Sequence, residues 1–117
     1  MNYLMIGAIS GCLVVIMGAF GAHALNETLD NYGKSIYNKA VLYHMFHSIA
    51  ILILGLINKI QPEITLSMSG WAFLFGIILF SGSLYILAIT GIKSLGMITP
   101  IGGILFIMGW IFLFIKV

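Results

Sequence analysis

Three histidines carry the most versatile chemistry in this 117-residue chain. His44 and His47 are three positions apart, a spacing that places both rings on one side of a helix. His23 lies in the glycine- and alanine-rich stretch GAFGAHAL at positions 18–25. An imidazole ring can bind a metal ion, carry a proton or form hydrogen bonds. With the hydroxyl-bearing residues that could partner the rings, the candidate polar pocket consists of His23, Tyr43, His44, His47, Ser48, Ser81 and Tyr85.

A metal site is the first chemistry to weigh. Zinc would need a third or fourth ligand beside His44 and His47, and no aspartate or glutamate lies at their depth. His23 comes from the same membrane face as the start of the second apolar stretch, but His44 lies about 10 Å deeper along its helix. We therefore expect no metal site and no cofactor.

Two other interpretations of the histidines stay open. Intramembrane histidines with hydroxyl neighbours can relay protons, which favours passage of protons or a small solute. Alternatively, a neutral His47 is bonded to Ser81 or Tyr85 and only specifies helix packing, as in a scaffold or an accessory membrane subunit. Catalysis is poorly indicated because Cys12 has no base near it in the sequence and the chain has no G-x-S-x-G motif. We expect a protein that is not an enzyme.

Four apolar stretches must position these side chains. The chain is 62% hydrophobic and 7% charged, which is more apolar surface than a small soluble domain can bury. Each stretch is close in length to the roughly 20 residues that cross the hydrocarbon core of a bilayer. The stretches cover about residues 3–25, 37–57, 67–90 and 98–115, and the connections between them are short. We expect an all-α, four-helix membrane bundle in a single domain, residues 1–117, with antiparallel sequential helices.

The first stretch has a second interpretation as a cleaved signal peptide, because residues 22–24 read Ala-His-Ala. Residues 1–6 carry no lysine or arginine, however, and the apolar run is longer than a signal core. We expect the stretch to be retained as a span.

The lysines give an orientation and bound the partners. Three flank one membrane face and two flank the other, which favours cytoplasmic first and third loops and both termini outside. The five are Lys34, Lys39 and Lys93 against Lys59 and Lys116. A net charge of +2 is too small to indicate nucleic acid, so the expected partner is the lipid bilayer, with a homo-oligomer as a further option.

Small residues line one face of the first stretch. Gly7, Gly11, Gly18 and Ala22 fall within an arc of about 60° on a helical wheel. Gly7 and Gly11 form a G-x-x-x-G pair, which lets helix backbones approach closely in lipid. This face either packs inside the bundle, the interpretation we favour, or forms a dimer seam.

A polar stripe marks the second stretch. It covers an arc of about 100° and must face protein or water, because an unpartnered polar group in lipid costs several kcal/mol. Its members are Tyr37, His44, His47, Ser48, Gly55 and Asn58. On the third stretch, Ser81 and Tyr85 lie at matching depth and are expected to supply hydroxyls. The fourth helix is expected to begin at Thr99 as N-cap, with Pro100 in the first turn.

Four motifs in order along the chain resemble one family. GAFGAHAL, YHMFH, FSGSLY and ITPIGG, with Gly109-Trp110 behind them, are similar to the domain of unknown function 423 family of small YwdK- and YgdD-like membrane proteins, which also resembles eukaryotic transmembrane protein 256. The resemblance implies an integral protein of the bacterial cytoplasmic membrane with about four helices, without an established activity, substrate or cofactor. It also implies that His44 occupies a position where the family often carries glutamine, a poor zinc ligand.

Overall fold

The structure, a computed structural model that describes all 117 residues, is built of helices and contains no strand. Four helical rods are long and apolar enough to cross a membrane, Tyr3–His23, Asn31–Ile60, Ser67–Thr90 and Lys93–Lys116. The elements in chain order are α1 (Tyr3–His23), α2 (Asn31–Ile60), α3 (Ser67–Gly76), a π-helical turn η1 (Ile77–Ser81), α4 (Gly82–Thr90), a 3₁₀ turn η2 (Lys93–Met97) and α5 (Thr99–Lys116). The expected all-α four-helix bundle is confirmed.

Capping residues set the helix ends. The Asp30 carboxylate accepts a hydrogen bond from the Gly33 N–H at 2.6 Å, so α2 begins six residues before the expected position 37. Gly91 closes α4 in the left-handed conformation, with φ of 72°. Thr99 does not cap α5 as expected, because its hydroxyl forms a 2.6 Å hydrogen bond with Ser83 Oγ and Ile98 stands at the cap position.

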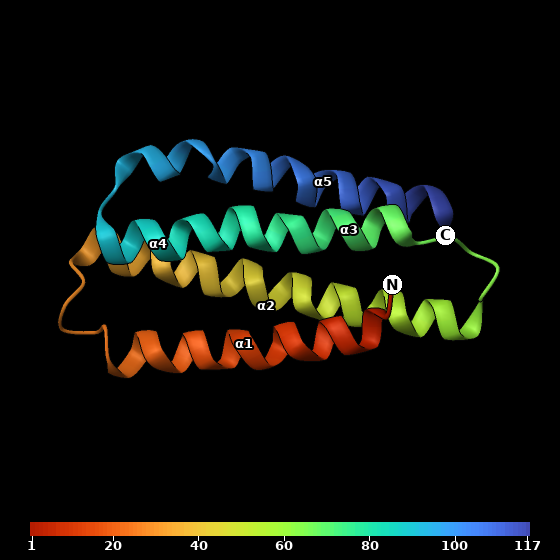
Figure 1. Cartoon of the computed structure of the whole chain (residues 1–117), viewed down its shortest axis with the longest axis horizontal. Helices are drawn as coiled ribbons and strands as arrows, with labels where there is room; N and C mark the ends of the chain where they lie inside the picture. Colours follow the sequence, from red (N-terminus) through yellow and green to blue (C-terminus); the bar gives the residue numbers. More distant parts are fainter.

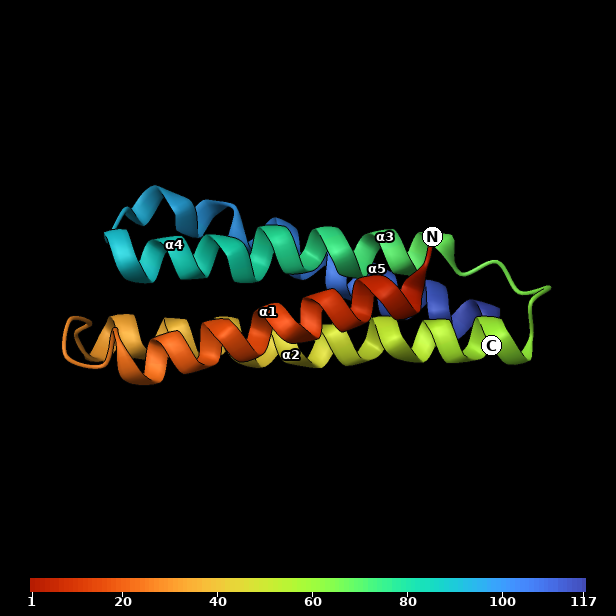
Figure 2. The ribbon, with the colours of Figure 1, turned by 60° about the horizontal axis from the view of Figure 1, so that its bottom comes forward.

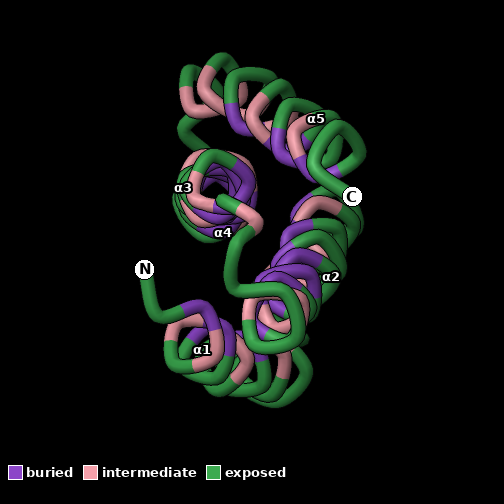
Figure 3. Tube along the Cα trace, turned by 90° about the vertical axis from the view of Figure 1, so that its right-hand side faces the viewer, coloured by how far each residue is buried: buried purple, intermediate pink, exposed green.

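The rods run antiparallel in chain order, and both termini lie at the same end (Figure 1). Viewed end on, they form a zigzag: α1 and α3–α4 lie on one side, and α2 and α5 lie on the other (Figure 3). The Cα atoms extend over 49 × 26 × 16 Å, so the bundle is a flat, staggered layer. Figure 2 shows α1 slanting from α2 toward the start of α3, where the Tyr3 ring would lie only 2.5 Å from a Cβ placed on Gly70.

Glycines form two tight seams, one between α1 and α2 and one between α5 and the third rod, which is made of α3, η1 and α4. A Cβ on Gly7 would lie 2.7 Å from the Leu52 side chain, and a Cβ on Gly102 would lie 2.3 Å from the Phe80 backbone nitrogen. Only a residue without a side chain allows its neighbours to approach this closely, and such close packing drives helix association in lipid.

The predicted small-residue face of α1 is partly wrong. Gly7 packs closely and Gly18 makes an ordinary contact of 3.7 Å, but Gly11 has no neighbour within 4 Å and Ala22 is exposed. The buried residues of α1 are Tyr3, Gly7, Ser10 and Val14. They define the face that packs against the bundle, and Gly11 and Ala22 lie at the edge of this face.

The π-helical turn η1 lies in the middle of the third rod. It holds one residue more per hydrogen-bonded ring than an α-helix, and such turns occur often at functional positions. The Ser81 hydroxyl donates to the Ala40 carbonyl of α2 at 2.8 Å, and α5 packs on the other side of the turn through Gly102. The turn therefore joins α2 and α5 at the centre of the bundle.

Candidate functional site

The polar stripe of α2 divides between two sets of neighbours. His44 faces α1 and α4, whereas His47 faces α5. Both rings are buried, with exposed fractions of 5% and 3%. Three residues on a helix differ by about 60° in direction, and in the staggered layer this is enough to separate the partners of the two rings.

His44 belongs to a chain of four hydrogen bonds. Its Nδ1 lies 2.9 Å from the Tyr85 hydroxyl, and its Nε2 lies 3.1 Å from Ser10 Oγ. Ser10 Oγ is 2.6 Å from Ser48 Oγ, which donates to the His44 carbonyl at 2.7 Å.

The carbonyl at the end of this chain fixes the direction of every bond. A carbonyl only accepts, so the Ser48 proton is used there and Ser10 must donate to Ser48. The Ser10 oxygen then accepts from His44 Nε2–H, and in the neutral ring His44 Nδ1 accepts from the Tyr85 hydroxyl. Although Ser10 and His44 are as close as a nucleophile and its base, the Ser10 proton points to Ser48, so His44 is not placed to remove it.

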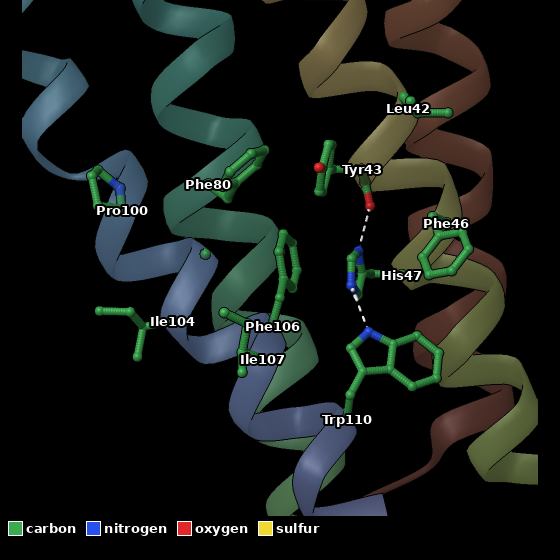
Figure 4. Close-up of a pocket in the computed structure, with 11 residues that line it drawn as sticks. Leu42, Tyr43, Phe46, His47, Phe80, Pro100, Ile104, Phe106, Ile107 and Trp110 are labelled. Atoms are coloured by element: carbon green, nitrogen blue, oxygen red, sulfur yellow. Dashed lines mark hydrogen bonds between the residues drawn. The ribbon is translucent and has the colours of Figure 1, made fainter.

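His47 is held by a different pair of partners (Figure 4). Its Nδ1 lies 2.8 Å from the Tyr43 carbonyl, and the Trp110 indole N–H donates to its Nε2 at 3.1 Å. An indole only donates and a carbonyl only accepts, so His47 carries its proton on Nδ1. The ring also stacks on Phe106, with centroids 3.6 Å apart and planes at 8°.

The expected partners of His47 are therefore wrong. Tyr85 bonds to His44, and Ser81 bonds to the Ala40 backbone. Ser48 belongs to the His44 chain, and the structure brings it together with Tyr85. His23, at the exposed end of α1, makes no side-chain hydrogen bond and lies outside both networks.

Sequence reasoning missed Ser10 and Trp110. Ser10 is a polar residue in the middle of the first apolar stretch, on the same face as Gly7, and this burial signal was available. Trp110 was noted only as part of a motif, because a tryptophan in an apolar helix is compatible with many environments. Neither imidazole has a nitrogen free for a metal ion, and no group of three or more histidine, cysteine or carboxylate side chains is close enough to hold one.

Two grooves open on opposite sides of the layer. The α2–α5 groove has a volume of about 660 Å³, and its walls include Tyr43, Phe46, His47, Phe80, Ile104 and Trp110. The α1–α4 groove has a volume of about 670 Å³, and its walls include Ile6, Ser10, Leu13, His44, Ile78 and Tyr85. Each groove thus has one of the two histidines in its wall, set among apolar side chains.

Tyr43 differs from the other polar residues of the candidate pocket. Its side chain is 39% exposed, and its hydroxyl has no hydrogen-bond partner in the protein. Its ring lies on the groove side of α2 and packs against Phe80, with centroids 4.6 Å apart (Figure 4). The α2–α5 groove therefore contains an unused hydroxyl.

Comparison with known proteins finds relatives that all belong to one group of membrane proteins. The family model described as "Protein of unknown function (DUF423)" matches residues 17–103. A UPF0382 membrane protein of Staphylococcus aureus, SAB0533, is 48% identical over 97% of this chain and 92% of its own length. The UPF0382 membrane protein YwdK of Bacillus subtilis is 41% identical over 93% of this chain and 89% of its own length. No solved structure matches the chain. Since the family model covers most of the chain and these relatives match nearly all of it, the protein belongs to the DUF423 family of multi-pass membrane proteins.

Proposed function

We propose that this membrane protein binds a small lipid-soluble molecule, which enters the α2–α5 groove sideways from the bilayer. The observation that carries the proposal is the groove itself, about 660 Å³ in volume and walled by aromatic and aliphatic side chains. This volume falls within the range of about 300–1,000 Å³ that is typical of small-molecule sites. The proposed place of action is a bacterial cytoplasmic membrane, supported by the relatives in Staphylococcus and Bacillus.

The depth of the groove supports entry from lipid. Tyr43 and His47 lie near the middle of the 30-residue α2. At about 1.5 Å per residue, this helix is about 45 Å long, so its middle falls within the hydrocarbon core of a bilayer about 30 Å thick. A molecule that reaches the groove between α2 and α5 must first dissolve among acyl chains.

Passage of protons or a small solute is the second candidate function. It is favoured by the His44–Tyr85 pair in the wall of the α1–α4 groove. The hydrogen-bonded chain that begins at Tyr85 ends at the carbonyl of His44, however, and the His47 network ends at the Tyr43 carbonyl. Because both networks end on backbone acceptors and a relay needs a further acceptor beyond its last donor, this geometry supports binding more than conduction.

Two glycines allow the binding proposal to be tested with a matched pair of variants. Gly103 lines the α2–α5 groove, and a Cβ there would lie 3.7 Å from Phe80 Cδ2, an ordinary contact. Gly82 lines the α1–α4 groove, and the nearest atom to a Cβ there is 4.0 Å away. Gly103→Leu and Gly82→Leu should each fill one groove without displacing a backbone.

The experiment is photolabelling of the full chain in bilayers with an apolar phenyl diazirine, followed by mapping of the labelled peptides. We expect saturable labelling of the groove walls on α2 and α5, lost in Gly103→Leu and kept in Gly82→Leu. Uniform, unsaturable labelling of all outer helix faces would contradict the proposal. A proton flux across liposomes that requires His44 would favour conduction instead, and absence of both labelling and flux, with a stable protein partner, would favour a scaffold.

A further inference from the structure

We propose that the occupant of the α2–α5 groove is an uncharged, planar ring that carries a carbonyl oxygen, that is, a quinone-type molecule, and that Tyr43 donates a hydrogen bond to this carbonyl. The inference rests on the proposed binding function and goes beyond it by assigning the chemical class of the ligand. It is built from the free hydroxyl, the orientation of the surrounding rings and the absence of charge.

The Tyr43 hydroxyl supplies the polar contact. The other polar side chains of the groove are already engaged, because Trp110 donates to His47 and His47 donates to the Tyr43 carbonyl. A phenol hydroxyl in a low-dielectric groove gains from an acceptor, and a ligand carbonyl can receive its proton without supplying one.

The rings beside the hydroxyl favour a flat ligand. Tyr43, His47 and Phe106 have nearly parallel planes, at 14° between Tyr43 and His47, 8° between His47 and Phe106 and 21° between Tyr43 and Phe106. Aromatic groups pair most favourably in offset stacks or edge-to-face contacts. A planar ring that lies parallel to this set makes an offset stack with it, whereas a bulky saturated ring system cannot follow the flat faces as closely.

The charge of the groove excludes an ionic headgroup. No lysine, arginine, aspartate or glutamate lines it. His47 is also held in one neutral form, because the Trp110 N–H occupies the position where a second proton would sit. An ion at this depth would lack a counter-ion, and its desolvation would be costly. An uncharged carbonyl compound needs no counter-ion and avoids the cost of desolvating an ion.

The test compares two flat probes with the same two-ring carbon skeleton, methylnaphthoquinone, which carries two carbonyl groups, and methylnaphthalene, which carries none. The full chain is placed in lipid nanodiscs with ¹⁵N-labelled tryptophan, and the indole N–H signals of Trp110 and Trp71 are followed during titration. Trp71→Phe assigns the two signals. Trp71 lies on α3 outside the groove and reports non-specific partitioning. Tyr43→Phe removes the hydroxyl and keeps the ring, and it breaks no hydrogen bond within the protein.

We expect saturable shifts of the Trp110 signal, with naphthoquinone bound about three- to five-fold more tightly than methylnaphthalene, as one hydrogen bond in a membrane gives. In Tyr43→Phe the two probes should bind equally well. Equal affinities in the unmodified protein would overturn the ligand class and leave the binding function standing. Absence of saturable shifts with either probe, or equal shifts at Trp71, would overturn the binding function itself.

Discussion

His44 and His47 lie one helical turn apart on α2, are equally buried and nevertheless have opposite hydrogen-bonding patterns. His44 donates from Nε2 to Ser10 and accepts at Nδ1 from Tyr85, whereas His47 donates from Nδ1 to a backbone carbonyl and accepts at Nε2 from Trp110. The position of the proton on an intramembrane histidine is therefore set by the types of its partners, and burial alone does not determine it.

The two environments also differ in whether they can accept a second proton on the imidazole ring. Tyr85 is a hydroxyl that can turn from donor to acceptor, so the His44 side can accommodate a second ring proton. Trp110 has no such freedom because its indole nitrogen only donates. The His44 side is thus an adjustable network between α1, α2 and α4, and the His47 side is a fixed wall of the α2–α5 groove.

The largest expected effect tests what holds the His47 wall in place. Gly102→Leu puts a Cβ 2.3 Å from the Phe80 backbone nitrogen, which forces α5 away from η1. We expect a loss of about 3 kcal/mol in unfolding free energy, measured by denaturation in mixed micelles, together with a change in Trp110 fluorescence. Gly103→Leu, one residue further on, is the control and should cost much less. Equal losses in the two variants would show that close packing of α5 on η1 does not hold this wall.

A smaller loss of unfolding free energy is expected when either histidine is replaced, and the two losses can be compared directly. His44→Leu removes two interhelical bonds, to α1 and α4, whereas His47→Leu removes one interhelical bond, to α5, and one bond within α2 to the Tyr43 carbonyl. At about 1 kcal/mol for each interhelical bond, we expect losses of about 2 and about 1 kcal/mol in unfolding free energy. Ile49→Leu, at a 52% exposed position, should change almost nothing. If His47→Leu proves the more damaging, the ring stack on Phe106 outweighs the hydrogen bonds.

The smallest effect concerns the position of the proton on each imidazole ring. The ¹⁵N chemical shifts of the imidazole nitrogens distinguish protonated from unprotonated positions. We expect Nε2–H for His44 and Nδ1–H for His47, as their partners require. Trp110→Phe should leave the proton on Nδ1, because the Tyr43 carbonyl still needs a donor, and should shift the Nε2 signal of His47 while the His44 signals stay unchanged. Identical tautomers in the unmodified protein would contradict the comparison.

The sequence was sufficient for the fold, because hydrophobic length and short connections leave few arrangements of four helices in a membrane. It singled out His44, His47, Ser48 and Tyr85, whose side chains do form hydrogen bonds inside the bundle, but it assigned the wrong partners to His47. The helical wheel treated a 60° difference between His44 and His47 as one face, and in a staggered layer that angle reaches different helices. Depth matching placed Ser81 near His47, and it could not foresee that the hydroxyl would satisfy the Ala40 carbonyl instead.

The π-helical turn at Ile77–Ser81 has a genetic consequence. A turn of this kind accommodates one extra residue in an otherwise α-helical rod, so losing a single codon from this segment would leave a regular, equally apolar helix of nearly the same length. Because the wide turn has absorbed that residue, the residues beyond the deletion would keep their direction, and Tyr85 would still face His44. One codon lost from α2 before His44, where no such turn exists, would instead rotate the residues beyond it by about 100°. Hydropathy would barely register either deletion, yet only the one in α2 would carry His44 away from its partners on α1 and α4.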